Sequence, residues 1–210
     1  MNDVKLRKKP KQARSLARFE AILDHAEGMI SEQGFESLKM NELARQAGVN
    51  IASIYQYFPN RTVVARAIVE RYLELYRAEL ALKLSDIPVS TQSPSIEMVD
   101  AMLDKLLAHY YQFLQQRPNF LLVWGAVRGN PDFIKLNMQD SQSNAELIVS
   151  AMQRIGINVQ PEVLATAAFL VCEITEPVMQ ALLNSDEVYA EKLLAQYRLM
   201  LSSYFQALID

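Results

Sequence analysis

The side chains best suited to chemistry lie close together near the N-terminus, in residues 50–57. Ser53, Tyr55 and Gln56 bring two hydroxyl groups and one amide within four positions. Hydroxyls can donate to phosphate oxygens, and a glutamine amide can pair with the edge of a base. The composition of this stretch therefore favours recognition of a nucleic acid over catalysis.

Patterns typical of enzymes and metal sites are missing from the sequence. Neither His25 nor His109 has a glutamate three positions before it, as a di-metal carboxylate site requires, and no Walker A or GxGxxG motif occurs. Cys172 is the single cysteine, so no intrachain disulfide can form. We therefore expect no enzymatic activity, metal or cofactor. The single cysteine and the absence of an apolar run long enough to span a membrane lead us to expect a cytoplasmic protein. A thiol-sensing role for Cys172 stays open.

Two short helices, expected at 40–47 and 51–58, must position the polar stretch. Between them stands Gly48-Val49-Asn50, where the glycine can adopt the positive φ of a tight turn. Asn50 is a favourable N-cap for the second helix, because its side-chain oxygen can accept from amides of the first turn. Two helices joined in this way form a helix-turn-helix unit.

The second helix should present one face outward. Ile54 and Phe58 lie four residues apart and should face the core. Ala52, Ser53, Tyr55 and Gln56 would then point to solvent, on a helix narrow enough to enter the DNA major groove.

The distribution of charge also favours nucleic-acid binding by the N-terminal part of the chain. Residues 1–66 hold eleven Lys and Arg against seven Asp and Glu, although the whole chain has a net charge of −3. A basic N-terminal part, here residues 1–66 and called the head below, followed by an acidic remainder is typical of a polyanion-binding module joined to a separate effector domain. We interpret residues 5–11 as a basic arm that reaches the minor groove or the DNA backbone, as an alternative to a merely solvated tail. The arm and the start of the first helix contribute the candidates Lys8, Lys9, Lys11 and Arg14.

The stretch GFESLKMNELARQAGVNIASIYQYFPNR, residues 34–61, resembles the N-terminal domain of the TetR repressor family. The resemblance implies a homodimer that binds a palindromic operator and releases it when a small-molecule effector binds. It also implies DNA contacts at Ile51, Ala52, Ser53, Tyr55 and Tyr57. The matching positions are Gly34-Phe35, Leu43-Ala44, Ala47-Gly48-Val49, Ile54-Tyr55 and Tyr57-Phe58-Pro59-Asn60-Arg61.

Two cationic positions complete this comparison. Arg61 stands where the family usually has a phosphate-contacting lysine, whereas Lys39 stands where many members have a threonine. The predicted DNA-binding set is therefore Lys8, Lys9, Lys11, Arg14, Lys39, Asn50, Ile51, Ala52, Ser53, Tyr55, Gln56, Tyr57 and Arg61.

Apolar residues at helical spacing continue to the C-terminus and predict an all-α fold of about nine helices. We divide the chain into a helix-turn-helix domain with its basic arm (1–60), a connecting helix (61–84) and a ligand-binding and dimerisation domain (85–210).

The last two helices, expected at about 161–183 and 187–208, should run antiparallel and form the dimer interface. Alternatively, their apolar stripe completes the core of each monomer. The stripe consists of Leu164, Ala168, Val171, Val178, Leu182, Leu194, Tyr197, Leu201, Tyr204 and Leu208.

Large apolar side chains and one glutamate of the C-terminal part are candidates for an effector cavity, with ordinary core packing as the alternative. A regulator without an effector, controlled by a protein partner or acting architecturally, is the second functional hypothesis. The candidates are Tyr110, Phe113, Trp124, Met138, Met152, Phe169 and Glu173.

Overall fold

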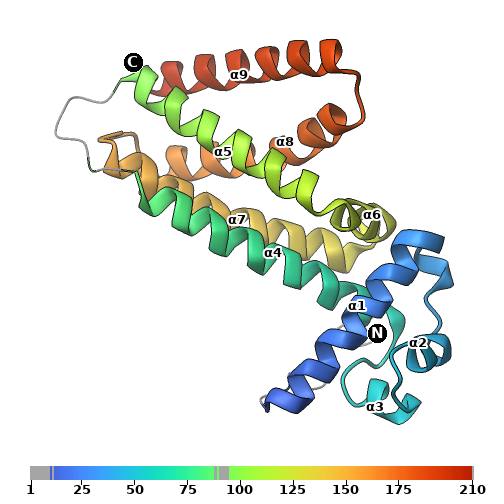
Figure 1. The fold of residues 1–210 in the computed structure, drawn as a ribbon. Helices are drawn as coiled ribbons and strands as arrows, with labels where there is room; N and C mark the ends of the chain where they lie inside the picture. Colours follow the sequence, from blue (N-terminus) through green and yellow to red (C-terminus); the bar gives the residue numbers. More distant parts are fainter. Residues whose placement is uncertain (1–9, 11, 88, 90–94, 210) are drawn as a thin grey trace. The chain divides into compact units, whose positions relative to one another are not determined.

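The computed structural model describes residues 10, 12–87, 89 and 95–209. Within these residues the chain forms nine α-helices and one short 3-10 helix, and no strand (Figure 1). The expected all-α class is confirmed. The elements are α1 (Ala13–Gln33), η1 (Phe35–Ser37), α2 (Met40–Gln46), α3 (Ile51–Tyr55), α4 (Arg61–Ser85), α5 (Ile96–Gln116), α6 (Pro118–Val127), α7 (Pro131–Arg154), α8 (Pro161–Leu183) and α9 (Glu187–Ile209).

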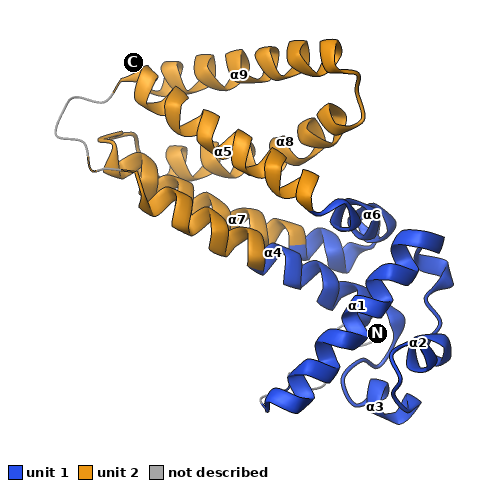
Figure 2. Cartoon of the chain, viewed as in Figure 1, with its two compact units in different colours: residues 1–74, 117–136 blue, residues 75–116, 137–210 orange. Residues whose placement is uncertain are grey.

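The helices gather into two compact units (Figure 2). Unit 1 comprises residues 1–74 and 117–136, and unit 2 comprises residues 75–116 and 137–210. Compactness therefore assigns α6 and the start of α7 to the same unit as the helix-turn-helix. The division expected from the sequence, into residues 1–60, 61–84 and 85–210, assigns functions to segments and is not tested by these compact units. It stays a prediction. No helix of the described residues is long and apolar enough to cross a membrane.

The core of unit 1 forms around α1, whose apolar residues recur at spacings of three and four. Phe19, Ile22, Leu23 and Ala26 are buried on this face, which contacts α2 and α6. Gly34 ends the helix with a φ of +83°, and its amide donates to the Ile30 carbonyl at 2.8 Å. A glycine at this position avoids the steric cost of a left-handed backbone.

A buried carboxylate joins three helices of unit 1. Glu27 on α1 accepts from the Arg71 guanidinium at 2.7 Å and from the Tyr72 hydroxyl on α4. The Asn119 amide on α6 donates to the same carboxylate at 3.2 Å. Because a buried charge is stable only with such partners, this cluster fixes the mutual placement of α1, α4 and α6.

Unit 2 is built on α5, α8 and α9, with the second part of α4 and most of α7. The buried face of α5 contacts both α8 and α9. Asp140 on α7 accepts from Arg77 of α4 and, at 2.8 Å, from Asn144. Burial raises the pKa of Asp140, while its hydrogen bonds to Arg77 and Asn144 act in the opposite direction.

Candidate nucleic-acid interface

The turn between α2 and α3 depends on Gly48, which has a φ of +63°. The next amide, that of Val49, donates back to the Ala44 carbonyl at 3.0 Å and so closes the end of α2. Leu43 and Ile54, one from each helix, are fully buried. The turn and these two anchors hold α3 against the rest of the head.

Asn50 caps α3 as expected from the sequence. Its Oδ1 accepts from the Ser53 amide at 2.7 Å and from the Ser53 hydroxyl at 2.8 Å. Ser53 is consequently buried, and the expectation that it faces outward is wrong. The cap draws the hydroxyl toward Asn50 instead of leaving it exposed.

The second helix of the pair is shorter than expected, because α3 ends at Tyr55 rather than at residue 58. Gln56 and Tyr57 form a turn after the helix, and Tyr57 and the following Phe58 are both buried. Phe19 of α1 meets the Tyr57 ring edge-on at 5.6 Å and stacks with the Phe58 ring at 5.0 Å. Aromatic packing therefore places Tyr57 inside the head, although the resemblance implied a DNA contact there.

Ala52, Tyr55 and Gln56 are the exposed side chains of this segment, and Ile51 is half-buried. Ala52, Tyr55 and Gln56 form one surface, which we call the α3 face. This face carries one small residue, one phenol and one amide, so it offers hydrogen-bond donors and acceptors where the backbone can approach a partner closely.

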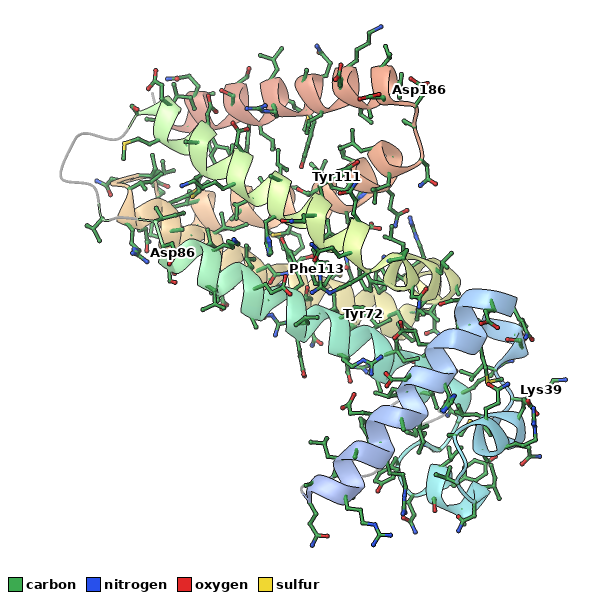
Figure 3. The ribbon with its side chains drawn as sticks, viewed as in Figure 1. Lys39, Tyr72, Asp86, Tyr111, Phe113 and Asp186 are labelled. Carbon is green, nitrogen blue, oxygen red and sulfur yellow. The ribbon has the colours of Figure 1, made fainter. Side chains whose placement is uncertain are left out.

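A hollow of about 430 Å³ adjoins the α3 face at the start of α4. It is lined by several predicted residues, among them Lys39, Tyr55 and Arg61, and also by Asn41 and Asn60. Asn60 was not in the predicted set. Its position after Pro59 was a usable signal, because Asn60 caps α4 by accepting from the Val63 amide at 3.0 Å. The head thus places an exposed lysine, labelled in Figure 3, close to a helix N-terminus.

Arg61 is held in place at this hollow. Its guanidinium donates to the Glu36 carboxylate at 2.7 Å and lies 4.8 Å from the centre of the Phe35 ring. Glu36 has 83% of its side chain exposed, so this ion pair is solvated. A pair of this kind contributes little to stability, and a phosphate can replace the carboxylate.

The other predicted cations differ in accessibility. Arg14 is exposed on the first turn of α1. Lys8, Lys9 and Lys11 lie outside the described residues. Arg45, which was not predicted, is exposed on α2 but paired with Glu42, and this hydrogen bond lowers the pKa of Glu42 to about 2.

The candidate effector residues are distributed over both units and differ in burial. Phe113 and Met152 are buried in unit 2, and Tyr110 and Phe169 are half-buried there. Trp124 is buried on α6, which belongs to unit 1.

Two further candidates are accessible to different degrees. Met138 is exposed on α7. Glu173 is half-buried and accepts from the Asn137 amide at 3.2 Å.

The expected stripe is divided between the core and the surface of the single chain, because Val178, Leu194 and Leu208 are half-buried and Tyr204 is exposed. Leu164, Val171, Leu182, Tyr197 and Leu201 are all buried within the single chain, because these side chains pack where α5, α8 and α9 meet. Tyr204 of the stripe and several apolar residues of the same two helices outside it are exposed, and we call this set the outer α8–α9 face. Its members are Val163, Leu170, Ile174, Val188, Tyr189, Leu199, Met200 and Tyr204.

Two family models match the chain. The first, described as "Bacterial regulatory proteins, tetR family", matches residues 22–68 and so includes the whole helix-turn-helix. The second, described as "Tetracyclin repressor-like, C-terminal domain", matches residues 99–205 and covers about half of the chain.

Curated relatives match a limited part of the chain. A helix-turn-helix transcriptional regulator of Mycobacterium tuberculosis is 35% identical over 66 residues, which are 31% of this chain and 33% of the relative. The probable regulator YttP of Bacillus subtilis is 29% identical over 85 residues, 40% of each chain. The chain thus spans about a third of the length of the first relative.

Solved structures share the fold over nearly the whole chain. A TetR-family regulator of Streptomyces coelicolor has a TM-score of 0.67 at 22% identity, covering 94% of this chain and 100% of its own. FadR of Bacillus halodurans, a fatty acid degradation regulator, has a TM-score of 0.66 at 17% identity, covering 92% and 97% of the two chains. With a helix-turn-helix head, a helical C-terminal part and both family models matched, the chain belongs to the TetR family of transcriptional regulators.

Proposed function

We propose that the chain is a repressor that binds a palindromic operator as a homodimer and leaves it when a small-molecule effector binds. The observation that carries the proposal is the α3 face, where Ala52, Tyr55 and Gln56 are exposed on a helix anchored by the buried Ile54. A rigid, narrow helix with accessible polar side chains suits the major groove, which is about 12 Å wide.

Each exposed residue has a distinct role in this proposal. Ala52 lets the backbone approach the bases, and the Gln56 amide pairs with a base edge. Tyr55, Lys39 and Arg61 surround the hollow at the start of α4 and contact the phosphates that fix the register of the head. Lys8, Lys9, Lys11 and Arg14 add sequence-independent attraction.

Similar structures support a small-molecule effector. SmeT of Stenotrophomonas maltophilia is the repressor of a multidrug efflux pump, and its structure has a TM-score of 0.59 with this chain at 18% identity, covering 87% of this chain and 91% of its own. A complex of SmeT with triclosan shares the same fold, with a TM-score of 0.58. We place the effector site of this chain in unit 2, within the part matched by the C-terminal family model.

The reading role of α3 is tested by DNA binding. The full-length protein selects its operator from a random DNA pool, and fluorescence anisotropy then measures the affinity of each variant for that operator. Replacing Gln56 with alanine should weaken binding about tenfold or more and relax the preference at one base pair, because one good base contact contributes about 1–3 kcal/mol.

Gln33→Ala is the matched control, since Gln33 is also exposed but lies at the far end of α1. We expect Gln33→Ala to bind like the original protein. Equal affinities of the two variants for the selected operator would contradict the assignment of α3.

A further inference from the structure

We propose that a groove between α5, α8 and α9 of unit 2 binds lipophilic monovalent cations. The groove has a volume of about 690 Å³, which is the range of drug-sized ligands. It shares no residue with the effector candidates expected from the sequence. Figure 3 labels Tyr111 on α5, which lines it, and Asp186 in the connection between α8 and α9 beside it.

The walls of the groove are apolar and come from all three helices. Leu107 and Tyr111 line it from α5, Met179 and Leu182 from α8, and Leu194 from α9. Leu107, Met179 and Leu182 are buried in the chain, so they form a fixed floor, whereas Tyr111 is half-buried. Such walls favour an alkyl or aryl body, and the Tyr111 ring offers a π face to a cation.

The rim of the groove is acidic. Asp104, Glu187 and Glu191 line it together with a single cation, Arg198. Arg198 is paired with Asp104. Glu187 and Glu191 lie four residues apart on α9 and so share one side of the helix. Among the described residues, no cation lies within salt-bridge distance of either glutamate.

Charge complementarity therefore selects the occupant. A cationic head at Glu187 and Glu191, with its apolar body against Leu107 and Leu194, satisfies both parts of the groove. An anionic amphiphile of the same length would meet two unpaired carboxylates. A second copy of the chain is a poorer fit, because exposed apolar residues such as Leu170 and Leu199 lie outside the groove.

Binding in the groove stands on its own, whereas its role as the effector site rests on the proposed function. If the cation also lowers operator affinity, the groove is that effector site. If the cation binds without changing operator affinity, release by this ligand is contradicted while the binding site is retained.

The probe is decyltrimethylammonium, used below its micelle-forming concentration and titrated into the full-length protein by calorimetry at low salt. Decanoate and 1-decanol serve as the anionic and neutral ligands with the same tail. We expect decyltrimethylammonium to bind at least about tenfold more tightly than decanoate, because the carboxylate pair attracts one head group and repels the other.

Two variants separate the charge of the groove from its shape. E187Q/E191Q should weaken binding of the cation about five- to tenfold and leave binding of 1-decanol unchanged, since each exposed carboxylate contributes a factor of a few. A108W places a large ring on an exposed alanine that lines the groove, and it should abolish binding of all three ligands.

E146Q/E162Q is the matched control, because it removes the same charge and likewise changes one glutamate in the first turn of a helix. It should bind the cation like the original protein. Equal affinity for the three ligands, or equal effects of the two double variants, would overturn the proposal. So would a change of molar mass in A108W by sedimentation without cation binding, because a second copy would then occupy the groove.

Discussion

Glu27 is the residue on which the order of unit 1 depends most clearly. Its carboxylate is buried and accepts from Arg71 and Tyr72 on α4 and from Asn119 on α6. Replacement by alanine leaves these donors without their acceptor. We expect Glu27→Ala to lower the free energy of unfolding by about 2–3 kcal/mol, measured by urea denaturation.

Asp24→Asn is the control for this prediction. Asp24 binds the same Arg71 at 2.7 Å, but 67% of its side chain is exposed. An exposed ion pair contributes at most about 1 kcal/mol, so the control should be nearly as stable as the original protein. Losses of equal size would show that burial of Glu27 is unimportant.

Cys172 illustrates how burial changes reactivity. Burial raises the pKa of the Cys172 thiol to about 12, and the neighbouring Asp140 and Glu173 act in the same direction. A raised pKa favours the neutral thiol, which is a poor nucleophile. At pH 8 we therefore expect alkylation by iodoacetamide to be at least about a hundredfold slower in the folded protein than in urea. Rapid labelling of the folded protein would restore the thiol-sensing hypothesis that the sequence left open.

Single residues also mark the limit of sequence reasoning at the head. The spacing of Ile54 and Phe58 correctly placed both in the core. The burial of Ser53 and Tyr57 was not predicted, because it depends on the cap at Asn50 and on the ring of Phe19. Helical periodicity describes which way a side chain points, but it does not include hydrogen bonds or rings from another segment.

At the scale of one element, α3 has only five residues and depends on its cap. Asn50 satisfies one backbone amide of a helix too short to be stable alone. We expect Asn50→Ala to destabilise the chain by about 1–2 kcal/mol and to weaken operator binding, whereas Asn50→Asp retains the cap and the stability. Thermal unfolding and anisotropy measure the two effects.

Asn60→Ala provides the comparison, because Asn60 caps the 25-residue helix α4 in the same way. Its loss should cost similar stability, but a long helix keeps its position without one cap. A larger loss of operator binding in Asn60→Ala than in Asn50→Ala would contradict the special dependence of α3 on its cap.

The bounds of the helices were largely predictable from the sequence. Glycine, proline and asparagine act locally, so Gly34, Gly48 and Pro161 mark helix ends in both the sequence and the structure. The end of α3 was not predictable in this way. Residues 56–58 continue the helical pattern, but Tyr57 and Phe58 turn inward to pack on α1.

At the scale of the whole molecule, the outer α8–α9 face is our proposed dimer interface. Leu170 and Leu199 are exposed there, by 41% and 60%. A glutamate at either position would be desolvated in the dimer without a partner. We expect Leu170→Glu and Leu199→Glu to raise the dimer Kd by at least about a hundredfold, measured by sedimentation equilibrium.

Leu82→Glu is the control, because Leu82 is 69% exposed but lies on α4. It should sediment like the original protein. Leu170→Glu and Leu199→Glu proteins that also remain dimeric would exclude this face as the interface.

The choice of face was beyond the sequence for a physical reason. Leu164 and Leu199 both fit a helical apolar pattern, and only the packing of α5 against α8 and α9 buries the first and exposes the second. The family and the fold were predictable because they depend on local motifs. The groove and the interface were not, since they depend on which faces of distant helices meet.

The brevity of α3 limits how much sequence a single head can distinguish. Five residues advance about 7.5 Å along the helix axis, which is close to the length of DNA spanned by three successive base pairs. One copy therefore recognises a very short DNA sequence, which occurs too often in any genome to identify a promoter. In the proposed dimer, specificity comes from binding two such half-sites at a fixed separation. Inserting or deleting a few base pairs between the half-sites should therefore lower operator affinity as much as changing a half-site itself.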